Sequence, residues 1–259
     1  MRIMSFNILA DVFVEPNKAF MDRWYPTLKY EDLLMKNRFQ TLIKYIKGDV
    51  IMLQEVTPHV RKRLCDIFGC DYIILPLSCH RTAKNITGNL TILRKNVFNS
   101  IKHSTMYVGD VAIGVTEADG VGIYNIHLND TSTEKRRGEL EQIMFTFDPT
   151  HKIIIGGDFN TNEKSLHNML MRADFTMNIP ARGTYLCEEA MIDYIYVRGF
   201  SHSTGQVNNS ISSTNCYQDT IRKYGSDHHP VSVVARRKEP TVPCNPPFTP
   251  NKGGGKGEP

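Results

Sequence analysis

Short apolar stretches of strand length recur along the sequence and alternate with segments of helical periodicity. Each stretch is rich in Ile, Val, Leu or Tyr and is bounded by Gly, Asn, Asp or Pro, which is typical of strands that end in turns. Nine strands are predicted, over residues 2–8, 49–53, 72–75, 90–93, 111–115, 121–127, 152–155, 192–197 and 231–235. Apolar residues at helical spacing predict four helices, over residues 31–47, 57–68, 132–145 and 162–172. Strands and helices mixed in this way indicate a layered α/β or α+β domain.

The predicted domain ends before the last stretch of the chain. No internal repeat and no linker is visible before position 237, so residues 1–237 are expected to form one domain. Residues 239–259 hold six Pro and four Gly, and such a composition cannot bury enough apolar surface to become ordered. We therefore expect residues 238–259 to form a flexible tail.

Composition supports a folded domain and says little about partners. Of the 259 residues, 41% are hydrophobic and 22% are charged, which excludes global disorder. The formal net charge is +4, but five basic and two acidic residues from Arg236 onward supply +3 of it. The remaining +1 does not by itself argue for nucleic acid, and no protein partner follows from the sequence.

Cysteine usage and hydropathy favour an intracellular protein. The six cysteines form no C-x-x-C pair and do not stand at zinc spacing with histidine, so we interpret them as reduced thiols. No apolar run approaches about 18 residues, the length that a membrane-spanning helix needs. No secretory signal peptide is visible at the start of the chain. We expect a cytoplasmic or nuclear location without a membrane span.

Polar residues of catalytic type stand at or beside the ends of the apolar strands. They are Asn7, Glu55, His127, Asp158, Asn160, Asp193, Asp227 and His228. Because strand ends are rigid and several of them can meet at one rim, we expect these side chains to converge. Hard oxygen ligands favour Mg²⁺ or Mn²⁺ over zinc, and a divalent ion with His and Asp suits the hydrolysis of a phosphate ester.

Taken singly, each of these residues also has an ordinary structural explanation. An Asp or Asn after a strand is commonly a turn or cap residue, and Asn160 could cap the helix predicted from residue 162. Glu55 could be a solvated acid in the first turn of a helix. Polar residues stand at the ends of six separate elements, which is hard to attribute to chance. We therefore favour a common site.

The motifs that carry these residues resemble those of the endonuclease/exonuclease/phosphatase superfamily, whose fold is that of DNase I. They are Ser5-Phe6-Asn7, Leu53-Gln54-Glu55, Asn125-Ile126-His127-Leu128, Gly156-Gly157-Asp158-Phe159-Asn160, Ile192-Asp193-Tyr194 and Ser226-Asp227-His228. The resemblance extends over about 230 residues in order and spacing. It implies a four-layer α/β sandwich, in which two packed mixed β-sheets are flanked by helices.

The resemblance also implies a role for each site residue. Glu55 is similar to the principal Mg²⁺ ligand, and Asn7 and Asp227 are similar to its supporting ligands. Asp158 resembles the residue that orients or deprotonates the attacking water, and Asn160 resembles the donor that holds the phosphate. In the remaining three positions, His228 resembles the imidazole on the scissile phosphate, Asp193 the carboxylate that orients it, and His127 a second catalytic imidazole.

Two branches of the superfamily are similar to this chain. Residues 5–11, Trp24-Tyr25-Pro26 and Arg38 resemble the deadenylase, nocturnin, angel and 2′-phosphodiesterase branch, which acts on RNA ends or linkages. Residues 53–58 and 127–132 resemble the tyrosyl-DNA phosphodiesterase branch. We expect a Mg-dependent nucleic-acid phosphodiesterase, with RNA favoured. The alternatives are a tyrosyl-DNA phosphodiesterase or DNA nuclease, an enzyme on a small phosphoester such as inositol phosphate, and an inactive nucleic-acid-binding module.

Three loop segments are candidates for substrate contact. Trp24 lies among aromatic and basic residues that could stack nucleobases and pair with phosphates. Arg81, and Arg136 with Arg137, lie in basic segments that could follow a nucleic-acid backbone. The alternative interpretations are an aromatic loop packed under the sheet and solvated charged surface.

Overall fold

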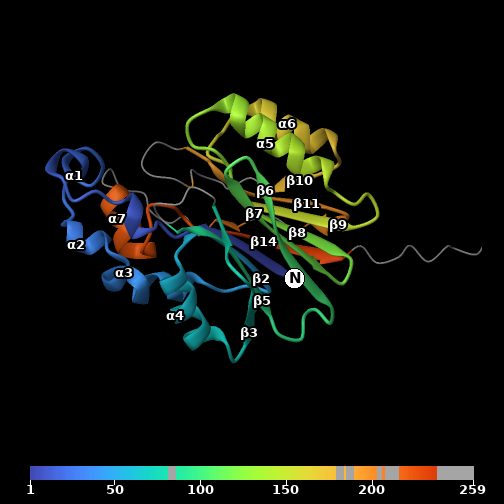
Figure 1. Cartoon of the computed structure of the whole chain (residues 1–259), viewed down its shortest axis with the longest axis horizontal. Coiled ribbons are helices and arrows are strands. Elements are labelled where there is room, and N and C mark those ends of the chain that lie inside the picture. Colours follow the sequence, from blue (N-terminus) through green and yellow to red (C-terminus); the bar gives the residue numbers. More distant parts are fainter. Residues whose placement is uncertain (81–85, 179–183, 185–189, 203–205, 208–215, 238–259) are drawn as a thin grey trace, which may run out of the picture.

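The computed structural model describes residues 1–80, 86–178, 184, 190–202, 206–207 and 216–237. In this part of the chain, two β-sheets pack face to face and helices cover their outer sides (Figure 1). The first sheet has the strand order β12-β14-β1-β2-β5-β3, with β13 beside β14 and β4 beside β5. The second sheet has the order β10-β11-β9-β8-β7-β6. The predicted four-layer α/β sandwich is therefore confirmed.

The elements have the following bounds. The strands of the first sheet are β1 (Arg2–Asn7), β2 (Val50–Val56), β3 (Tyr72–Ile74), β4 (Ser78–Cys79), β5 (Gly88–Arg94), β12 (Phe200–His202), β13 (Gln206–Val207) and β14 (Val231–Arg237). The second sheet consists of β6 (Ile101–Val108), β7 (Val111–Ala118), β8 (Val121–His127), β9 (Lys152–Asp158), β10 (Thr176–Asn178) and β11 (Asp193–Arg198). The helices are α1 (Lys18–Trp24), α2 (Tyr30–Leu33), α3 (Met35–Leu42), α4 (Pro58–Phe68), α5 (Thr133–Phe145), α6 (Lys164–Arg172) and α7 (Cys216–Tyr224).

Side chains that point alternately to the two faces of the central strands divide the core into layers. Because successive side chains of a strand point to opposite faces, Ile3 and Ile154 meet between the two sheets. Their neighbours Met4 and Phe6 point outward and pack under α3 and α4. On the other side, Ile153 packs under α5 and α6 in the same way. Strands that are apolar on both faces thus hold the four layers together.

Two parallel strand pairs bring the polar strand ends to one edge. β1 runs parallel to β2, with Asn7 opposite Gln54. β8 runs parallel to β9, with His127 opposite Asp158. The antiparallel strand β11 begins with Asp193 opposite the same Asp158. Because the carboxyl ends of parallel neighbours lie at the same edge of a sheet, residues far apart in sequence become neighbours there.

The single helix predicted over residues 31–47 is wrong. The structure divides this segment into α2, α3 and a 3-10 turn (Ile43–Tyr45), and Leu34 between the two helices is extended, with ψ 134°. The break lets Leu33 pack with Tyr25 in a small peripheral cluster, while Phe39 packs under the first sheet. One straight helix could not present apolar side chains to both places.

The hydrophobic pattern of the sequence does not predict several of the observed elements. β6 is an edge strand whose exposed and half-buried positions alternate, and it carries Lys102, His103 and Ser104 in place of an apolar run. The helices α1 and α7 are short, with seven and nine residues, as are β4, β10, β12 and β13. Short elements give too few periods for a pattern to be recognised.

Two further predictions concern the whole chain. β14 ends at Arg237, where the predicted domain ends, and the predicted tail of residues 238–259 lies outside the described residues, so that boundary stays a prediction. Within the described part of the chain, no helix has the length and apolar character needed to cross a membrane.

Candidate active site

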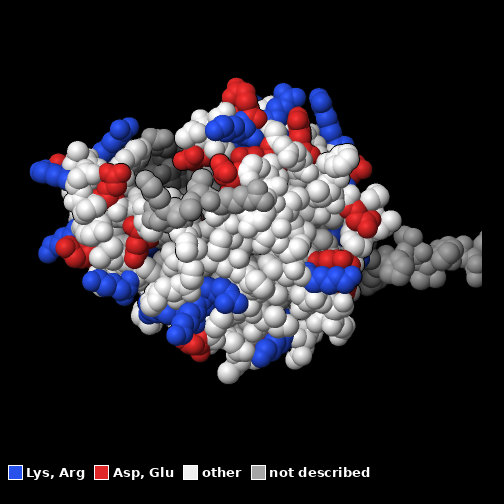
Figure 2. All heavy atoms as spheres, viewed as in Figure 1, with Lys and Arg blue, Asp and Glu red and all other residues white. Residues whose placement is uncertain are grey.

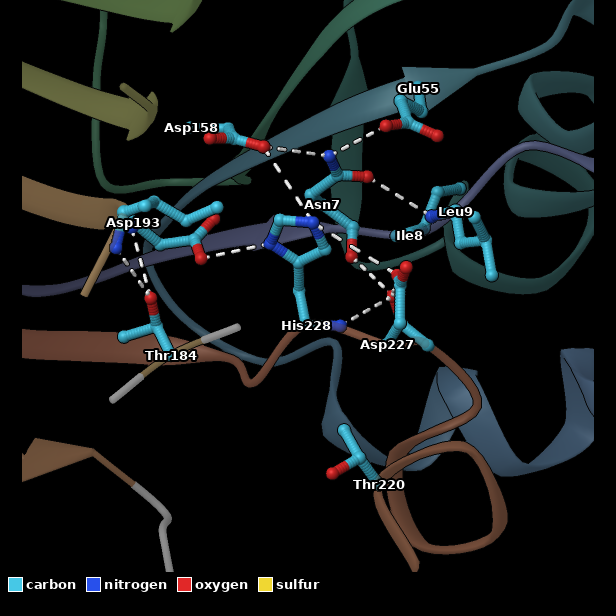
Figure 3. Close-up of polar contacts among 12 residues, drawn as sticks. Asn7, Ile8, Leu9, Glu55, Asp158, Thr184, Asp193, Thr220, Asp227 and His228 are labelled. Atoms are coloured by element: carbon cyan, nitrogen blue, oxygen red, sulfur yellow. Dashed lines mark hydrogen bonds and ion pairs between the residues drawn. The ribbon is translucent and has the colours of Figure 1, made fainter. Parts of the chain in front are cut away.

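A pocket of about 580 Å³ opens at the edge where the parallel strands end. Six of the eight predicted site residues line it, namely Glu55, His127, Asp158, Asn160, Asp227 and His228. The other two, Asn7 and Asp193, have no exposed surface and lie directly behind the lining residues (Figure 3). In the space-filling view the surface is hollowed between the α1 end and the α5 end, and acidic side chains stand near the hollow (Figure 2).

A backbone irregularity directs Glu55 into the pocket. The register between β2 and β5 shifts between Leu53 and Val56, and Glu55 has a positive φ of 59°. A bulge of this kind re-aims a side chain at the end of a strand. One carboxylate oxygen of Glu55 accepts from Asn7 Nδ2 at 2.8 Å, and the other accepts from the backbone N–H of Ala10 at 2.8 Å.

The amide of Asn7 links the two acids that stand on either side of it. Its Nδ2 donates to Glu55 Oε1 at 2.8 Å and to Asp158 Oδ2 at 3.0 Å (Figure 3). Its Oδ1 accepts from the backbone N–H of Leu9 at 3.1 Å, which fixes the orientation of the amide. Both hydrogens of Nδ2 are thus used, and Asn7 holds the two carboxylates at a set separation.

Asp158 lies at the centre of the site and depends on a glycine beside it. Its Oδ2 stands 3.7 Å from Nε2 of His127 and 3.7 Å from Nε2 of His228, and only 1% of the residue is exposed. A Cβ at Gly157 would stand 1.9 Å from the backbone oxygen of Ile126, so only glycine lets β8 and β9 approach each other here. The second Gly of the Gly-Gly-Asp segment therefore serves the close strand packing that positions Asp158.

His228 is held between carboxylates and carries a charge. Its Nδ1 hydrogen-bonds Asp193 Oδ2 at 2.9 Å, and the backbone N–H of Asp193 donates to Thr184 Oγ1 at 3.0 Å. Burial alone would lower the pKa of His228, but the negative charges of Asp193 and Asp158 outweigh it and hold the pKa well above the usual value. The ring is therefore an imidazolium whose orientation Asp193 sets.

Asp227 faces the pocket from the loop before β14. Its Oδ2 accepts from the Tyr25 hydroxyl at 3.1 Å. The preceding residue, Ser226, donates from Oγ to the backbone carbonyl of Asn7 at 2.7 Å and ties this loop to the end of β1. The sequence analysis named Tyr25 only within the Trp24-Tyr25-Pro26 motif and did not predict its contact with Asp227.

The donor set around Glu55 and Asp227 fits a hard divalent cation. Burial raises the pKa of the Glu55 carboxyl, the charge of His127 opposes this, and the charge of Asp227 raises it further. No Lys or Arg is among the described residues that line the pocket. A cation between these oxygens would neutralise the excess negative charge, and oxygen-rich sites of this kind suit Mg²⁺ or Mn²⁺.

A second group of potential ligands has a different explanation. Single atoms of Asp158, Asp193 and His228 lie within 4.8 Å of one another and could in principle surround an ion. The hydrogen bond between His228 Nδ1 and Asp193 occupies that nitrogen, and the imidazolium already compensates the two acids. We therefore interpret this group as a hydrogen-bonded charge network.

Two histidines on the opposite wall differ from His228. His80 and His127 contact each other edge to face, with ring centroids 6.0 Å apart. Nδ1 of His80 accepts from the backbone N–H of Ala112 at 3.1 Å, so the ring proton resides on Nε2. Burial and the charge of His127 lower the pKa of His80 to about 4. His80 is thus a fixed neutral donor in the pocket wall, and nothing in the sequence distinguishes it from its basic neighbours.

Arg38 fastens the loops behind the site. The buried guanidinium donates to the backbone carbonyls of Leu33, Ile8 and Gly225 at 2.6, 2.6 and 2.7 Å, and also to that of Leu9. The carbonyls of Ile8 and Leu9 follow Asn7, that of Gly225 precedes Asp227, and that of Leu33 ends α2. A buried cation that satisfies several carbonyls at once fixes their relative positions.

The predicted substrate contacts have different surroundings. Trp24 lines the pocket, together with Phe13 and Phe20. Arg136 is buried and donates to the Asn129 carbonyl at 3.1 Å, so its side chain serves the fold. Arg137 is exposed on α5, pairs with Glu141 at 3.0 Å and does not line the pocket. Arg81 lies outside the described residues.

Comparisons with known proteins agree with this geometry. A family model described as the endonuclease/exonuclease/phosphatase family matches residues 4–228. No curated protein matches the sequence. Among solved structures, the chain is similar to ANGEL2, a 2′,3′-cyclic phosphatase, with 15% identity and a TM-score of 0.66, covering 90% of this chain and 93% of that one.

Two other solved structures show the same fold. The mannosyl-6-phosphatase of Bacteroides thetaiotaomicron is 14% identical, with a TM-score of 0.64 over 91% of this chain and 99% of its own. The human nocturnin catalytic domain with a bound sulfate is 13% identical, with a TM-score of 0.62 over 90% of this chain and 92% of its own. At these identities the likeness concerns the fold alone.

Proposed function

The chain belongs to the endonuclease/exonuclease/phosphatase family, and from this premise we propose that it is a Mg²⁺- or Mn²⁺-dependent phosphodiesterase that hydrolyses nucleic acid, with RNA favoured. Members of this family are hydrolytic phosphoesterases. The observation that carries the proposal is the meeting of Glu55, Asp158 and the Asp193–His228 pair at one pocket. Together these residues would supply a metal ligand, a base and a charged donor, which are the groups that hydrolysis of a phosphate ester needs.

The proposed metal ligands are Glu55 and Asp227, with Asn7 in support. A divalent cation bound there would neutralise charge on the phosphoryl oxygens. Asn7 Oδ1 already accepts from the Leu9 N–H, so Asn7 acts mainly by fixing Glu55. The Tyr25 hydroxyl holds Asp227 from behind, as partners behind ligands commonly do.

Asp158 is the proposed base for the attacking water. Its Oδ1 accepts from the Asn160 N–H at 2.8 Å, and its Oδ2 accepts from the Asn7 amide at 3.0 Å and stands 3.7 Å from Nε2 of His228. The water gives a proton to Asp158 as its oxygen attacks phosphorus in line with the leaving oxygen. The leaving oxygen departs on the opposite side of phosphorus, which would face the cation at Glu55 and Asp227, and it takes up a proton from solvent water.

His228 and Asn160 are the proposed phosphate donors. With Nδ1 on Asp193, the Nε2–H of the imidazolium is the group that His228 offers to a phosphoryl oxygen. Asn160 uses Nδ2 to donate to the Leu128 carbonyl at 2.8 Å, which leaves its second amide hydrogen for the phosphate. Preorganised donors of this kind stabilise the charge that develops in the transition state.

The aromatic wall supports a nucleic-acid substrate. Phe13, Phe20 and Trp24 line one side of the pocket, and 47% of Phe13 is exposed. The guanidinium of Arg23 stands 4.8 Å from the ring centroid of Trp24. Exposed aromatic faces stack nucleobases, and each stacked base contributes about 1–3 kcal/mol.

A small phosphoester is the second candidate substrate. The described pocket lining contains five carboxylates, from Glu55, Asp110, Asp130, Asp158 and Asp227, and no Lys or Arg. Such a lining repels additional phosphates and favours a compact substrate with neutral hydroxyls. The structural similarity to a mannosyl-6-phosphatase agrees with this alternative.

A panel of phosphoesters separates these candidates. Poly(A) RNA, 2′-5′ oligoadenylate, a 5′-tyrosyl oligonucleotide, plasmid DNA and inositol phosphates are each incubated with Mg²⁺ and with EDTA. We expect Mg²⁺-dependent cleavage of an RNA substrate, which Asp158→Asn abolishes. Cleavage of inositol phosphate alone would contradict the nucleic-acid proposal, and cleavage of the tyrosyl oligonucleotide alone would replace RNA by a tyrosyl-DNA substrate.

A further inference from the structure

A second cavity adjoins the catalytic pocket beneath α5. It has a volume of about 350 Å³ and lies between α5 and the turn that joins β6 to β7. Asp110, Val111 and Asn129 line both cavities, so the two meet along these residues. The rest of the groove is formed by Lys135, Gly138 and Glu139 of α5, among others.

The chemistry of this groove differs from that of the aromatic wall. The Lys135 ammonium is exposed, and no ion pair to it is found among the described residues. Asn129 uses Oδ1 to accept from the N–H groups of Thr131 and Ser132, so its Nδ2 is directed away from that turn. The groove thus combines cationic and amide donors with the carboxylates of Asp110 and Glu139.

Gly138 keeps the groove open. It lies in the middle of α5, where a glycine lowers helix stability relative to alanine. A Cβ built at Gly138 would find no atom within 4 Å, so packing does not require glycine there. Because Gly138 lines the groove, a long side chain at this position is expected to reduce the space in it.

We infer that this groove is a second nucleoside subsite, which takes the nucleoside on the far side of the scissile phosphate from the aromatic wall. Base amines and ribose hydroxyls can donate to Asp110, and base carbonyls can accept from Asn129 Nδ2. Glu139 is buried, and its Oε2 accepts from the Asn129 backbone N–H at 2.8 Å, which positions Asn129 in the groove. Lys135 stands at the exposed side, where a following phosphate would emerge. The inference rests on the proposed nucleic-acid hydrolysis and names the part of the substrate that the second cavity recognises.

Two variants of α5 test the subsite without touching the catalytic residues. Gly138→Met fills the groove, and Lys135→Gln removes its cation. The matched control is Arg137→Met, on the same helix turn but outside both cavities. The substrates are the dinucleotide ApA and the two p-nitrophenyl esters of adenosine phosphate, each of which lacks one nucleoside.

If the groove binds a nucleoside, the groove variants should lower kcat/KM only for substrates that place a nucleoside or a following phosphate there. Gly138→Met should lower kcat/KM for ApA about ten-fold, while the p-nitrophenyl ester that lacks the groove nucleoside is cleaved at the wild-type rate. With the trinucleotide ApApA as an additional substrate, which carries a following phosphate, Lys135→Gln should lower kcat/KM about three-fold. Arg137→Met should leave all rates unchanged, and the melting temperature of Gly138→Met should not fall. A wild-type ratio between ApA and the ester in both groove variants would overturn the subsite. If the wild-type protein cleaves none of these compounds, the proposed function fails before any variant is compared.

Discussion

The floor of the pocket and its walls are built in different ways. The floor consists of strand ends, where Asn7 is joined to Glu55 and Asp158 by hydrogen bonds of 2.8 and 3.0 Å; Asn7 and Asp158 are buried, and Glu55 is half-buried. The walls consist of a short helix, a two-residue strand and a turn, which bring Trp24, His80 and Asp110 to the opening. In the proposed function, the floor would carry out the chemistry, and the walls, which are made of short elements, would select the substrate.

The floor and the wall of the pocket also shift the pKa of a histidine in opposite directions. His228, on the floor, lies between two carboxylates that raise its pKa despite its burial. His80, in the wall, receives a backbone N–H on one nitrogen and faces another imidazole, and its pKa falls to about 4. The same residue type is therefore a cation in one region and a neutral donor in the other, because its neighbours decide the charge.

Removing Asp158, the proposed general base, should have the largest effect on turnover. We expect Asp158→Asn to lower kcat at least about 10³-fold, because the variant loses both the proton acceptor and the partner of two imidazoles. Turnover is measured on the best substrate of the panel, with Asp66→Asn on the exposed side of α4 as the control. Retention of more than a tenth of the wild-type turnover would show that another group activates the water.

Disturbing the partner of His228 should have a smaller effect on turnover. We expect Asp193→Asn to lower kcat about 10²-fold, since the imidazole loses the carboxylate that fixes its orientation and its charge. Nitrogen NMR of His228 at pH 7 should change from an imidazolium to a neutral ring. An unchanged imidazolium spectrum together with unchanged kcat would contradict the role of Asp193.

Removing the hydroxyl behind Asp227 should weaken metal binding without changing the chemistry. We expect Tyr25→Phe to raise the Mg²⁺ concentration needed for half-maximal activity about ten-fold, because partners behind metal ligands contribute 10- to 100-fold in affinity. At saturating Mg²⁺, kcat should return to the wild-type value. Phe20→Leu, in the same wall but without a hydroxyl, serves as the control and should leave the Mg²⁺ dependence unchanged.

The smallest effect concerns His80 and the stability of the fold at low pH. The pKa of His80 is about 4 in the folded state and close to 6.5 when unfolded, so the unfolded chain binds the additional proton as the pH falls between these values. Stability from this group is present above pH 6.5 and is lost towards pH 4, at about 1.4 kcal/mol for each pKa unit. His80→Gln should make the unfolding free energy less dependent on pH in this window. An equally steep dependence in wild type and variant would contradict the buried neutral ring.

The floor could be predicted from the sequence, and most of the walls could not. Asn7, Glu55, Asp158 and His228 follow or flank long apolar strands, and long strands are recognisable from their pattern. The role of Asp193 in orienting His228 came from the family resemblance and stays a prediction; in the structure Asp193 Oδ2 lies 2.9 Å from His228 Nδ1.

The walls depend on tertiary contacts that leave no local pattern. His80 lies in the wall because the two-residue strand β4 pairs with β5 and because Ala112 of β7 donates to its ring. Arg136 and Arg137 are adjacent in sequence, yet one is buried in contacts with the fold and the other is exposed, since they occupy different faces of α5. Sequence spacing alone does not separate these cases.

The most direct test of the account is the Glu55→Gln variant, assayed for Mg²⁺ binding by calorimetry and for turnover of the best nucleic-acid substrate in the same buffer. Glutamine keeps the size of the side chain but removes the charge that would hold the cation, and its single amide oxygen can accept only one of the two hydrogen bonds that Glu55 accepts from Asn7 Nδ2 and the Ala10 N–H. We predict that the wild-type protein binds Mg²⁺ and cleaves the substrate, while Glu55→Gln stays folded and loses both. Near-normal turnover of Glu55→Gln in Mg²⁺ would contradict the central claim.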